Sequence, residues 1–241
     1  MSRNKIEKIA EKLSDYFGEP FNAKQNPPAI LDVLIATKLS QNTTDKSSFK
    51  AYKNLRIKYN TWEKVSKAET EQIKECIKIC GLSDTKARNI KEMLVKMKRN
   101  YGNLDLRFLH EYTNEEVYTE LLQYAGLGKK TISCVLIFAM GRDAFPVDTH
   151  VHRILNRLGI VKTNTPEKTY EKADIIIPEG KKYELHSNLI KFGRNICTAK
   201  NPLCNICFLY KECMFDEKKI HRKNQIKENA ANNNFIILEN I

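Results

Sequence analysis

Apolar residues recur at helical spacing along most of the chain. Before the sequence Gly-Glu-Pro at 18–20, a first helix is predicted from an apolar stripe made of Ile6, Ile9, Ala10, Leu13 and Phe17. The segment 27–40 is apolar on most of its sides, which predicts a short buried helix. The segment 45–59 that follows is amphipathic, so it predicts a helix with one solvent-facing side.

Polar residues at the expected helix starts support three more helices. The predicted caps are Ser83 or Asp84 for a helix ending at Gly102, Thr113 with Glu116 as a capping box, and Thr165 followed by Pro166. Strand signals are nearly absent, since only 235–239 has a β-like cluster, inside the polar segment 217–241 that we expect to be a disordered tail. The sequence therefore predicts an all-α fold.

The net charge changes the range of expected partners. The 241-residue chain carries 41 Lys and Arg against 29 Asp and Glu, a formal charge of +12. The last 25 residues hold five Lys or Arg and three Glu, so most of this charge belongs to the folded body. Such a charge favours an acidic partner, nucleic acid or an anionic membrane surface, although a merely soluble basic surface explains it equally well.

The expected location of the protein rests on two signals that are not seen in the sequence, a membrane span and a signal peptide. No stretch is long and apolar enough to span a bilayer, and the first twelve residues lack the apolar core of a signal peptide. We therefore expect an intracellular protein, in the cytoplasm or at the nucleoid, without a membrane partner. Disulfides are not expected there.

Four of the seven cysteines crowd into 17 residues. They are Cys197, Cys204, Cys207 and Cys213, and the other three, Cys76, Cys80 and Cys134, lie in apolar helical patterns and are predicted in the core. Zinc sites usually pair cysteines as two C-x2-C knuckles, but here only one pair has that spacing. Gaps of six, two and five strongly favour a metal, and they suit a cubane iron-sulfur cluster moderately.

A glycine-bearing turn is the first candidate for chemistry. Gly126 and Gly128 lie between two predicted helices and precede Lys129 and Lys130. Glycines permit unusual backbone angles, and free amides at the start of the second helix suit a phosphate of a nucleic acid, although an ordinary helix-helix turn has the same sequence. An ammonium is disfavoured at this end of a helix and beside a like charge, so Lys130 is a candidate nucleophile. The alternative is that both lysines only contact phosphate.

Asp148 is the second candidate. It is well placed as the N-cap of a predicted helix beginning at Thr149, which is a purely structural role. The same carboxylate is able to stabilise positive charge on a sugar ring or to help move protons. The two roles are compatible.

The motifs together resemble the endonuclease III branch of the helix-hairpin-helix DNA glycosylases. They are Tyr-Ala-Gly-Leu-Gly-Lys-Lys-Thr at 124–131, Val-Asp-Thr-His at 147–150, the C-x6-C-x2-C-x5-C run, and the segments 34–45 and 81–90, in the family's order. The resemblance covers roughly residues 5–215. It implies two helical lobes: a six-helix domain with the hairpin over 23–142, and a cluster domain of 1–22 with 143–216.

The resemblance also implies the reaction. In the family the lysine eighteen positions before the aspartate is catalytic, which selects Lys130 over Lys129. Lys130 is expected to attack C1′ of a nucleotide extruded from double-stranded DNA, to displace an oxidised pyrimidine, and to leave an imine that loses the 3′ phosphate by β-elimination. Asp148 is expected to support the oxocarbenium-like charge and the proton transfers. The implied cofactor is a [4Fe-4S] cluster on the four cysteines, and a monomer is expected.

Three further DNA contacts are expected by resemblance. The residue that fills the gap left in the duplex aligns with Asn42, one place after Gln41, and Leu82 matches the apolar wedge of the opposite loop. Lys200 is the one cation in the loop between the first two clustered cysteines. The alternatives are a polar helix end for Gln41 and Asn42 and a core position for Leu82.

Two departures from the family pattern leave the substrate open. Tyr124 and Ala125 replace the usual leucine-proline, and His152 stands where an aromatic often follows. Uracil or thymine mispaired with guanine, or abasic sites only, are alternative substrates. An alternative from another class is a non-catalytic iron-sulfur protein that binds DNA or senses redox state.

Overall fold

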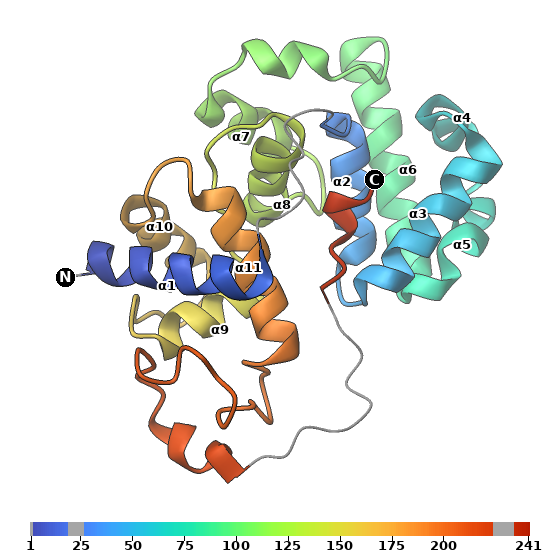
Figure 1. Ribbon diagram of the computed structural model, residues 1–241. Coiled ribbons are helices and arrows are strands. Elements are labelled where there is room, and N and C mark those ends of the chain that lie inside the picture. Colours follow the sequence, from blue (N-terminus) through green and yellow to red (C-terminus); the bar gives the residue numbers. More distant parts are fainter. Residues whose placement is uncertain (1, 19–26, 224–233) are drawn as a thin grey trace. The chain divides into compact units, whose positions relative to one another are not determined.

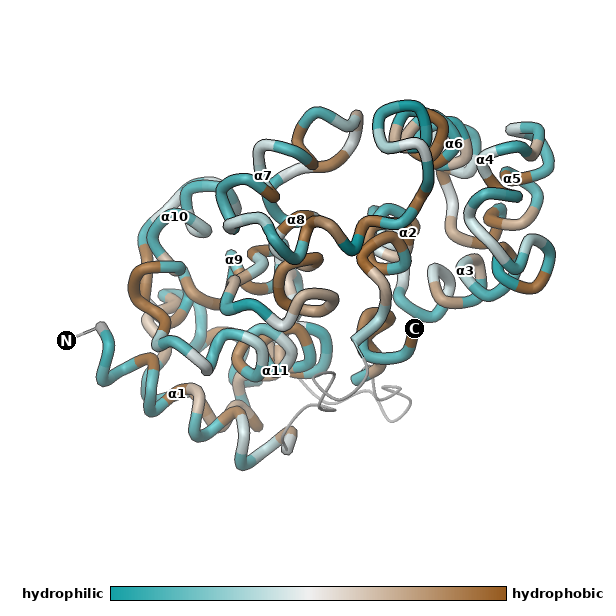
Figure 2. Tube along the Cα trace, turned by 90° about the horizontal axis from the view of Figure 1, so that it is seen from above, coloured by the Kyte–Doolittle hydropathy of each residue, from teal (hydrophilic) through white to brown (hydrophobic). Residues whose placement is uncertain are grey.

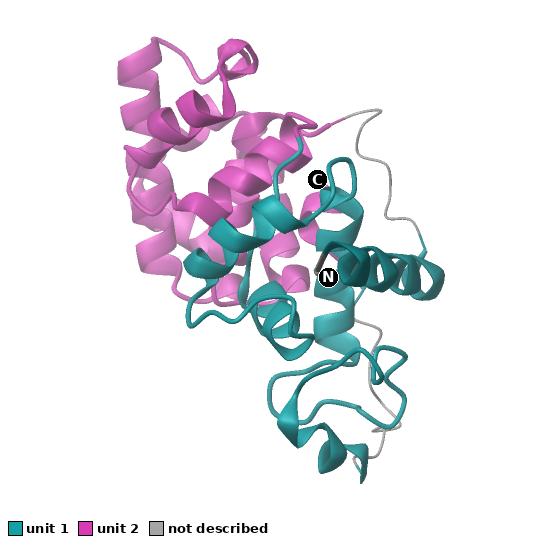
Figure 3. Ribbon diagram, turned by 90° about the vertical axis from the view of Figure 1, so that its left-hand side faces the viewer, with its two compact units in different colours: residues 1–22, 143–235 teal, residues 23–142, 236–241 magenta. Residues whose placement is uncertain are grey.

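The computed structural model describes residues 2–18, 27–223 and 234–241, and the regular elements within these ranges are helices without a strand (Figure 1). This confirms the predicted all-α fold. The chain divides into two compact units, one of residues 1–22 and 143–235 and one of residues 23–142 and 236–241 (Figure 3). Among the described helices, none combines the length and the apolar character needed to cross a membrane.

The unit of residues 23–142 and 236–241 is built around one buried helix. Its helices are α2 (Ile30–Ser40), α3 (Asp45–Tyr59), α4 (Trp62–Lys67), α5 (Thr70–Ile77), α6 (Ser83–Tyr101), α7 (Asn114–Leu122) and α8 (Lys129–Cys134), with 3-10 turns at Lys78–Cys80, Arg107–Glu111 and Ile237–Glu239. As predicted, α2 is buried along most of its length, and it packs against α3, α6 and α8. Figure 2 shows the apolar residues gathered along it.

The other unit packs helices from both ends of the sequence. It contains α1 (Ser2–Phe17), α9 (Thr149–Arg157), α10 (Pro166–Ile176) and α11 (Lys182–Asn195), followed by 3-10 turns at Asp216–Lys219 and His221–Lys223. Helix α11 packs against both α1 and α9. The predicted stripe on α1 is confirmed at Ile6, Ile9 and Leu13, which are fully buried. Burial of this stripe joins the first helix to the second half of the chain.

The predicted caps of α7 and α10 are confirmed. The Thr113 hydroxyl accepts from the Glu116 amide, and the Glu116 carboxylate accepts from the Thr113 amide at 2.7 Å. The Thr165 hydroxyl caps α10 ahead of Pro166.

The prediction of Ser83 or Asp84 as the N-cap of α6 is wrong. Leu82 occupies that position in the left-handed conformation, and Ser83 is already helical. The Asp84 carboxylate lies 2.8 Å from the Lys74 ammonium, so its side chain makes an ion pair with α5.

The expected disordered tail at 217–241 is also wrong for the part that the structure describes. Residues 216–219 and 221–223 form 3-10 turns. Near the end of the chain, Ile236, Ile237 and Leu238 are buried, and their segment contacts α2 and α3. The β-like cluster is therefore a 3-10 turn held by apolar burial, while residues 224–233 lie outside the described residues.

Candidate functional site

The turn between α7 and α8 needs a glycine at one position. Gly126 has φ +75°, and a Cβ there would lie 2.7 Å from the Lys38 Nζ atom. That ammonium, buried on α2, donates to the Ala125 carbonyl at 3.0 Å. Gly128 has φ −114° and open space around it, so the prediction of unusual backbone angles is confirmed for Gly126 alone.

Lys129 and Lys130 are the first two residues of α8. Gly128 is the N-cap and supplies no side chain, so the amides of this turn have no side-chain cap. Lys129 is exposed and Lys130 is half-buried. The next residues along the helix are buried, and the helix continues as a π-helical turn over Val135–Ala139. The apolar continuation anchors the turn that carries the two amines.

Asp148 is the N-cap of α9, as predicted. Its Oδ1 atom accepts a hydrogen bond from the Val151 amide at 2.8 Å, and the residue is half-buried. The structural role is therefore present. The bond fixes the direction of the carboxylate, which a catalytic role also requires.

The two loops expected to enter DNA share an unusual backbone conformation. Within the described ranges, Asn42 (φ +54°) and Leu82 (φ +50°) are the non-glycine residues in the left-handed region of backbone angles. Gln41 and Asn42 are exposed just after α2 ends, and the Leu82 side chain is 61% exposed. The alternative of a core leucine is wrong.

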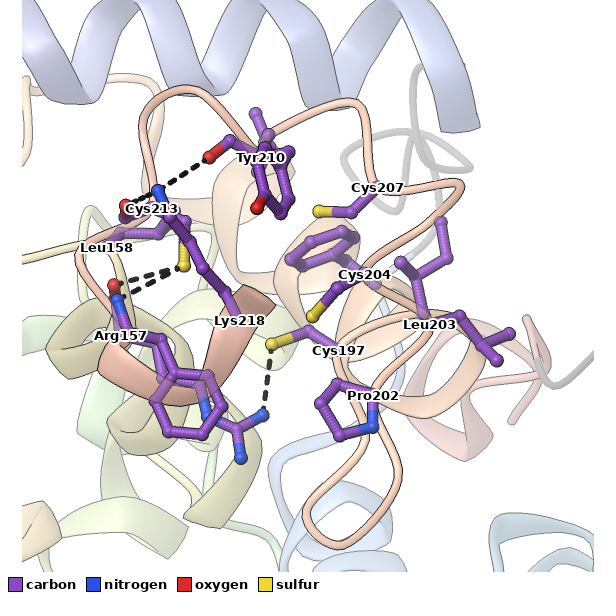
Figure 4. A pocket seen from close by; sticks show the side chains of 14 residues that line it. Arg157, Leu158, Cys197, Pro202, Leu203, Cys204, Cys207, Tyr210, Cys213 and Lys218 are labelled. Carbon is purple, nitrogen blue, oxygen red and sulfur yellow. Dashed lines mark hydrogen bonds between the residues drawn. The ribbon is translucent and has the colours of Figure 1, made fainter. Parts of the chain in front are cut away.

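The four clustered cysteines line one pocket within their own unit (Figure 4). Its other lining residues are Arg157, Leu158, Phe192, Ile196, Pro202, Leu203, Leu209, Tyr210, Phe215 and Lys218. Figure 4 shows the sulfur atoms of Cys197, Cys204, Cys207 and Cys213 around a common space. The sequence run is thus folded into a single apolar chamber with four sulfur atoms.

The donor set of this chamber, four cysteine thiols, fits a metal group bound by thiolates. Within the described ranges, no group of three or more His, Cys, Asp or Glu is arranged to hold a metal ion. Burial raises the pKa of Cys207 to about 12, and burial followed by the nearby Cys197 raises the pKa of Cys204 and Cys213. Thiolates in this chamber therefore require a bound cation, and a cubane distributes four thiolates over four irons.

Charged side chains on α9 and after the cysteine run hold the cysteine loop. The Arg157 guanidinium donates to the Thr198 and Ala199 carbonyls at 2.8 and 3.0 Å and lies 3.4 Å from the Cys197 sulfur. The Lys218 ammonium donates to the Cys213 carbonyl at 2.6 Å. Sequence reasoning missed both residues. A visible signal was the spacing of Arg153 and Arg157, which places both on one face of α9, and the Arg153 guanidinium also donates to the Cys197 carbonyl at 2.8 Å.

A second group that sequence reasoning missed consists of buried lysines on the hairpin's unit. Lys38 and Lys86 are 2% and 5% exposed. The Lys86 Nζ atom donates to the carbonyls of Leu39 and Cys80, at 2.9 Å each. Burial lowers the pKa of both lysines. Lys86 lies in the polar segment 83–89, which does not predict burial, whereas the apolar surroundings of Lys38 were a visible signal.

The remaining predicted residues have ordinary environments. Lys200 is exposed in the loop between Cys197 and Cys204. Tyr124 is buried, and its hydroxyl donates to the Tyr101 hydroxyl at 2.7 Å. The His152 ring lies 2.7 Å from the Thr169 hydroxyl, which links α9 to α10. Of the predicted core cysteines, Cys80 and Cys134 are buried, whereas Cys76 is half-buried.

Comparisons with known proteins agree with this arrangement. Residues 35–179 match the model of the HhH-GPD superfamily of base excision DNA repair proteins. The chain is 38% identical to endonuclease III of Thermotoga maritima over 214 residues, which are 89% of this chain and 94% of the relative.

Solved structures give the same result. A non-covalent endonuclease III–DNA complex matches 91% of this chain and 99% of its own, with 27% identity and a TM-score of 0.78. A trapped endonuclease III–DNA covalent intermediate matches the same shares, with 28% identity and a TM-score of 0.76. The chain therefore belongs to the endonuclease III family of helix-hairpin-helix DNA glycosylases and abasic-site lyases, within the HhH-GPD superfamily of base excision DNA repair proteins.

Proposed function

We propose that the Lys130 amine is the nucleophile with which this chain excises a damaged base and then cleaves the DNA strand. The observation that carries the proposal is the position of Lys130, half-buried in the first turn of α8 directly after the tied glycine hairpin. The trapped covalent intermediate of the related endonuclease III supports a covalent route. Double-stranded DNA with a damaged or abasic nucleotide is the proposed partner of a monomeric enzyme, acting on chromosomal DNA inside the cell.

The proposed chemistry begins with the neutral amine. Its lone pair forms a bond to C1′ of an extruded nucleotide, and the glycosidic bond breaks with its electron pair going to the base, which is then protonated. The attached nitrogen then loses one proton, and its lone pair breaks the C1′–O4′ bond. O4′ takes up a proton, which leaves a protonated imine between Lys130 and C1′. Loss of a C2′ proton then expels the 3′ phosphate by breaking the C3′–O bond, and water hydrolyses the imine to release Lys130.

Asp148 has a proposed part in the same steps. A carboxylate stabilises the positive charge that develops on the sugar as the base departs, and it is able to take up and return protons. The hydrogen bond from the Val151 amide orients the carboxylate before substrate binds. One residue therefore serves as helix cap and as catalytic group.

The hairpin and the two loops are the proposed DNA contacts. The amides that follow Gly126 and Gly128 would hold a backbone phosphate, with Lys129 beside them and Lys200 as a further cation. The exposed Leu82 side chain would wedge into the stack, and Gln41 or Asn42 would fill the vacated position. An oxidised pyrimidine is the proposed base, and a panel of duplexes with one lesion each, including uracil and thymine opposite guanine, tests this choice.

We also propose that Cys197, Cys204, Cys207 and Cys213 hold a [4Fe-4S] cluster. The common chamber and the irregular spacing support it. When bound, the cluster supplies structural cross-linking to this part of the chain, because base excision requires no electron. Chemical analysis of purified protein should give about four iron and four sulfide per chain. Zinc in place of iron, or no metal in protein purified without oxygen, would overturn the assignment.

Reductive trapping tests the proposed function. Borohydride reduces the imine to a stable amine, so wild-type protein mixed with an abasic duplex should give a covalent protein–DNA adduct. Lys130→Ala should give none, whereas Lys129→Ala, which removes the same charge one residue earlier, should still be trapped. If wild-type protein gives no adduct on any abasic or damaged duplex, the chain is a DNA-binding module instead of a lyase.

A further inference from the structure

Two exposed loops of one unit each place a non-glycine residue in the left-handed backbone conformation. Asn42 and Leu82 both have φ near +50°, where side chains with a Cβ atom are rarely found. Such a conformation persists only when the surrounding structure fixes it. The question is what fixes these two loops, which are far apart in the sequence.

The Lys86 ammonium touches the base of both loops. Its Nζ atom donates to the Leu39 carbonyl, two residues before Gln41, and to the Cys80 carbonyl, two residues before Leu82, at 2.9 Å each. Lys86 extends from the first turns of α6, and its own amide donates to the Leu82 carbonyl at 3.0 Å. One side chain therefore joins the points where the two loops leave their helices.

The two bonded carbonyls explain why the Lys86 ammonium is buried between the two loops. The Leu39 carbonyl is among the last of α2, and the Cys80 carbonyl ends a 3-10 turn, so neither has a partner within its own helix. An ammonium has three donors and is favoured at the negative end of a helix. At 5% exposure, water is poorly placed to replace it, so removing the ammonium would leave two buried acceptors unsatisfied.

The helix itself has other anchors. Helix α6 packs against α4 and α5, and Ile90, Met93, Leu94 and Met97 on its inner face are buried. An apolar side chain at position 86 would preserve that packing. Such a side chain would not hold the Leu39 and Cys80 carbonyls at a fixed spacing, because the ammonium is the group that donates to both.

We propose that Lys86 is a positioning residue that sets the spacing of the Gln41–Asn42 loop and the Leu82 loop, so that both enter a damaged duplex together. The inference rests on the proposed function of these loops. It assigns Lys86 no contact with DNA. Its effect should therefore appear in lesion binding and should depend on the presence of Leu82.

A double-mutant cycle with Leu82 tests the inference. Dissociation constants are measured for a duplex with a tetrahydrofuran abasic-site analogue and for the same duplex undamaged, with wild type, Lys86→Met, Leu82→Ala and the double variant. Lys86→Met should weaken binding of the abasic duplex by roughly tenfold and of the undamaged duplex by less than about twofold. In the Leu82→Ala background the loss on the abasic duplex should shrink to about twofold.

Lys98→Met is the matched control. It removes the same charge near the other end of α6, so any purely electrostatic loss should be equal in the two methionine variants. Circular dichroism establishes that each variant is folded. If Lys86→Met does not fold, Lys86→Arg enters the same cycle, since its longer side chain keeps the charge but changes the spacing of the carbonyls, and a smaller loss with the same dependence on Leu82 is expected.

The outcomes separate the inference from the proposed function. Equal losses on both duplexes, a loss matched by Lys98→Met, or an effect of Lys86 that is unchanged by Leu82→Ala would overturn the positioning role. Wild-type protein that does not prefer the abasic duplex would instead contradict the proposed function.

Discussion

Asp148 is proposed to serve structure and chemistry through the same atoms. Its carboxylate caps α9 by accepting a hydrogen bond from the Val151 amide, and it is also the proposed catalytic carboxylate. Asparagine is as good an N-cap as aspartate, but it carries no charge and does not exchange protons in this way. The two roles can therefore be separated at this position.

We predict that Asp148→Asn keeps the stability of the protein within a few tenths of a kcal/mol and slows base release by on the order of 10²-fold or more. Asp148→Ala should slow base release as well, and it should also lower the free energy of unfolding by about 1 kcal/mol because the cap is missing. Urea denaturation and single-turnover base release measure the two effects. An Asp148→Asn enzyme as fast as wild type would show that the residue is only a cap.

The sequence predicts candidate functional residues where their spacing along the chain is informative. The four cysteines stand out by their intervals, and the pair Lys130 and Asp148 is selected by an interval that resembles the family's. The partners of Lys38 and Lys86 could not be found this way, because each ammonium bonds a carbonyl that is distant in the sequence, 87 residues away for Lys38 and 47 residues away for Lys86.

At the scale of elements, helix interiors were predictable and helix ends were less so. The apolar stripe of α1 and the buried helix α2 follow directly from hydrophobic periodicity. The start of α6 was misjudged because Leu82 adopts a conformation that its residue type does not suggest. The tail was wrongly predicted to be disordered because its composition is polar and Asn-rich. Its three apolar residues at 236–238 are buried against helices that are distant in the sequence.

The docked tail yields a stability prediction. Ile236, Ile237 and Leu238 are at most 6% exposed, and the Ile237 amide donates to the Asp45 carboxylate at 3.0 Å. Ending the chain at residue 235 should lower the free energy of unfolding by about 3 kcal/mol, since apolar burial outweighs the ordering of a short segment. The midpoint of urea denaturation reports the change.

A pair of point variants controls for the truncation. Ile237→Ala should cost about 2 kcal/mol as a core substitution, and no more than the truncation, because the segment can undock. Ile220→Ala changes the same residue type where the side chain is 70% exposed, and it should cost less than about 0.5 kcal/mol. Equal midpoints for all three variants and wild type would contradict the docking of the tail.

At the scale of the whole molecule, the net charge of +12 fits a nucleic-acid partner. Family membership in base excision DNA repair makes the phosphate backbone the expected counterpart of this charge. Composition suggested an acidic partner without naming it, and the combination of hairpin, aspartate and cysteine run identified the family. The identity of the excised base does not follow from either, because it depends on a pocket that forms around an extruded nucleotide.

Salt dependence tests the electrostatic part of DNA binding. If about six phosphates are neutralised, the association constant should fall by roughly 10³-fold between 50 and 200 mM salt, because the bound counterions are released. Fluorescence anisotropy with an undamaged duplex measures this directly. An affinity that barely changes over that range would contradict a phosphate-dominated interface.

The central claim is that one amine, at position 130, forms the bond to deoxyribose. Peptide mapping of the borohydride-trapped adduct tests it most directly: after nuclease and protease digestion, mass spectrometry locates the residual sugar on a peptide. The sugar should be found on Lys130 and not on Lys129. A modification at Lys129, at the chain's amino terminus or at another lysine would contradict the proposed mechanism.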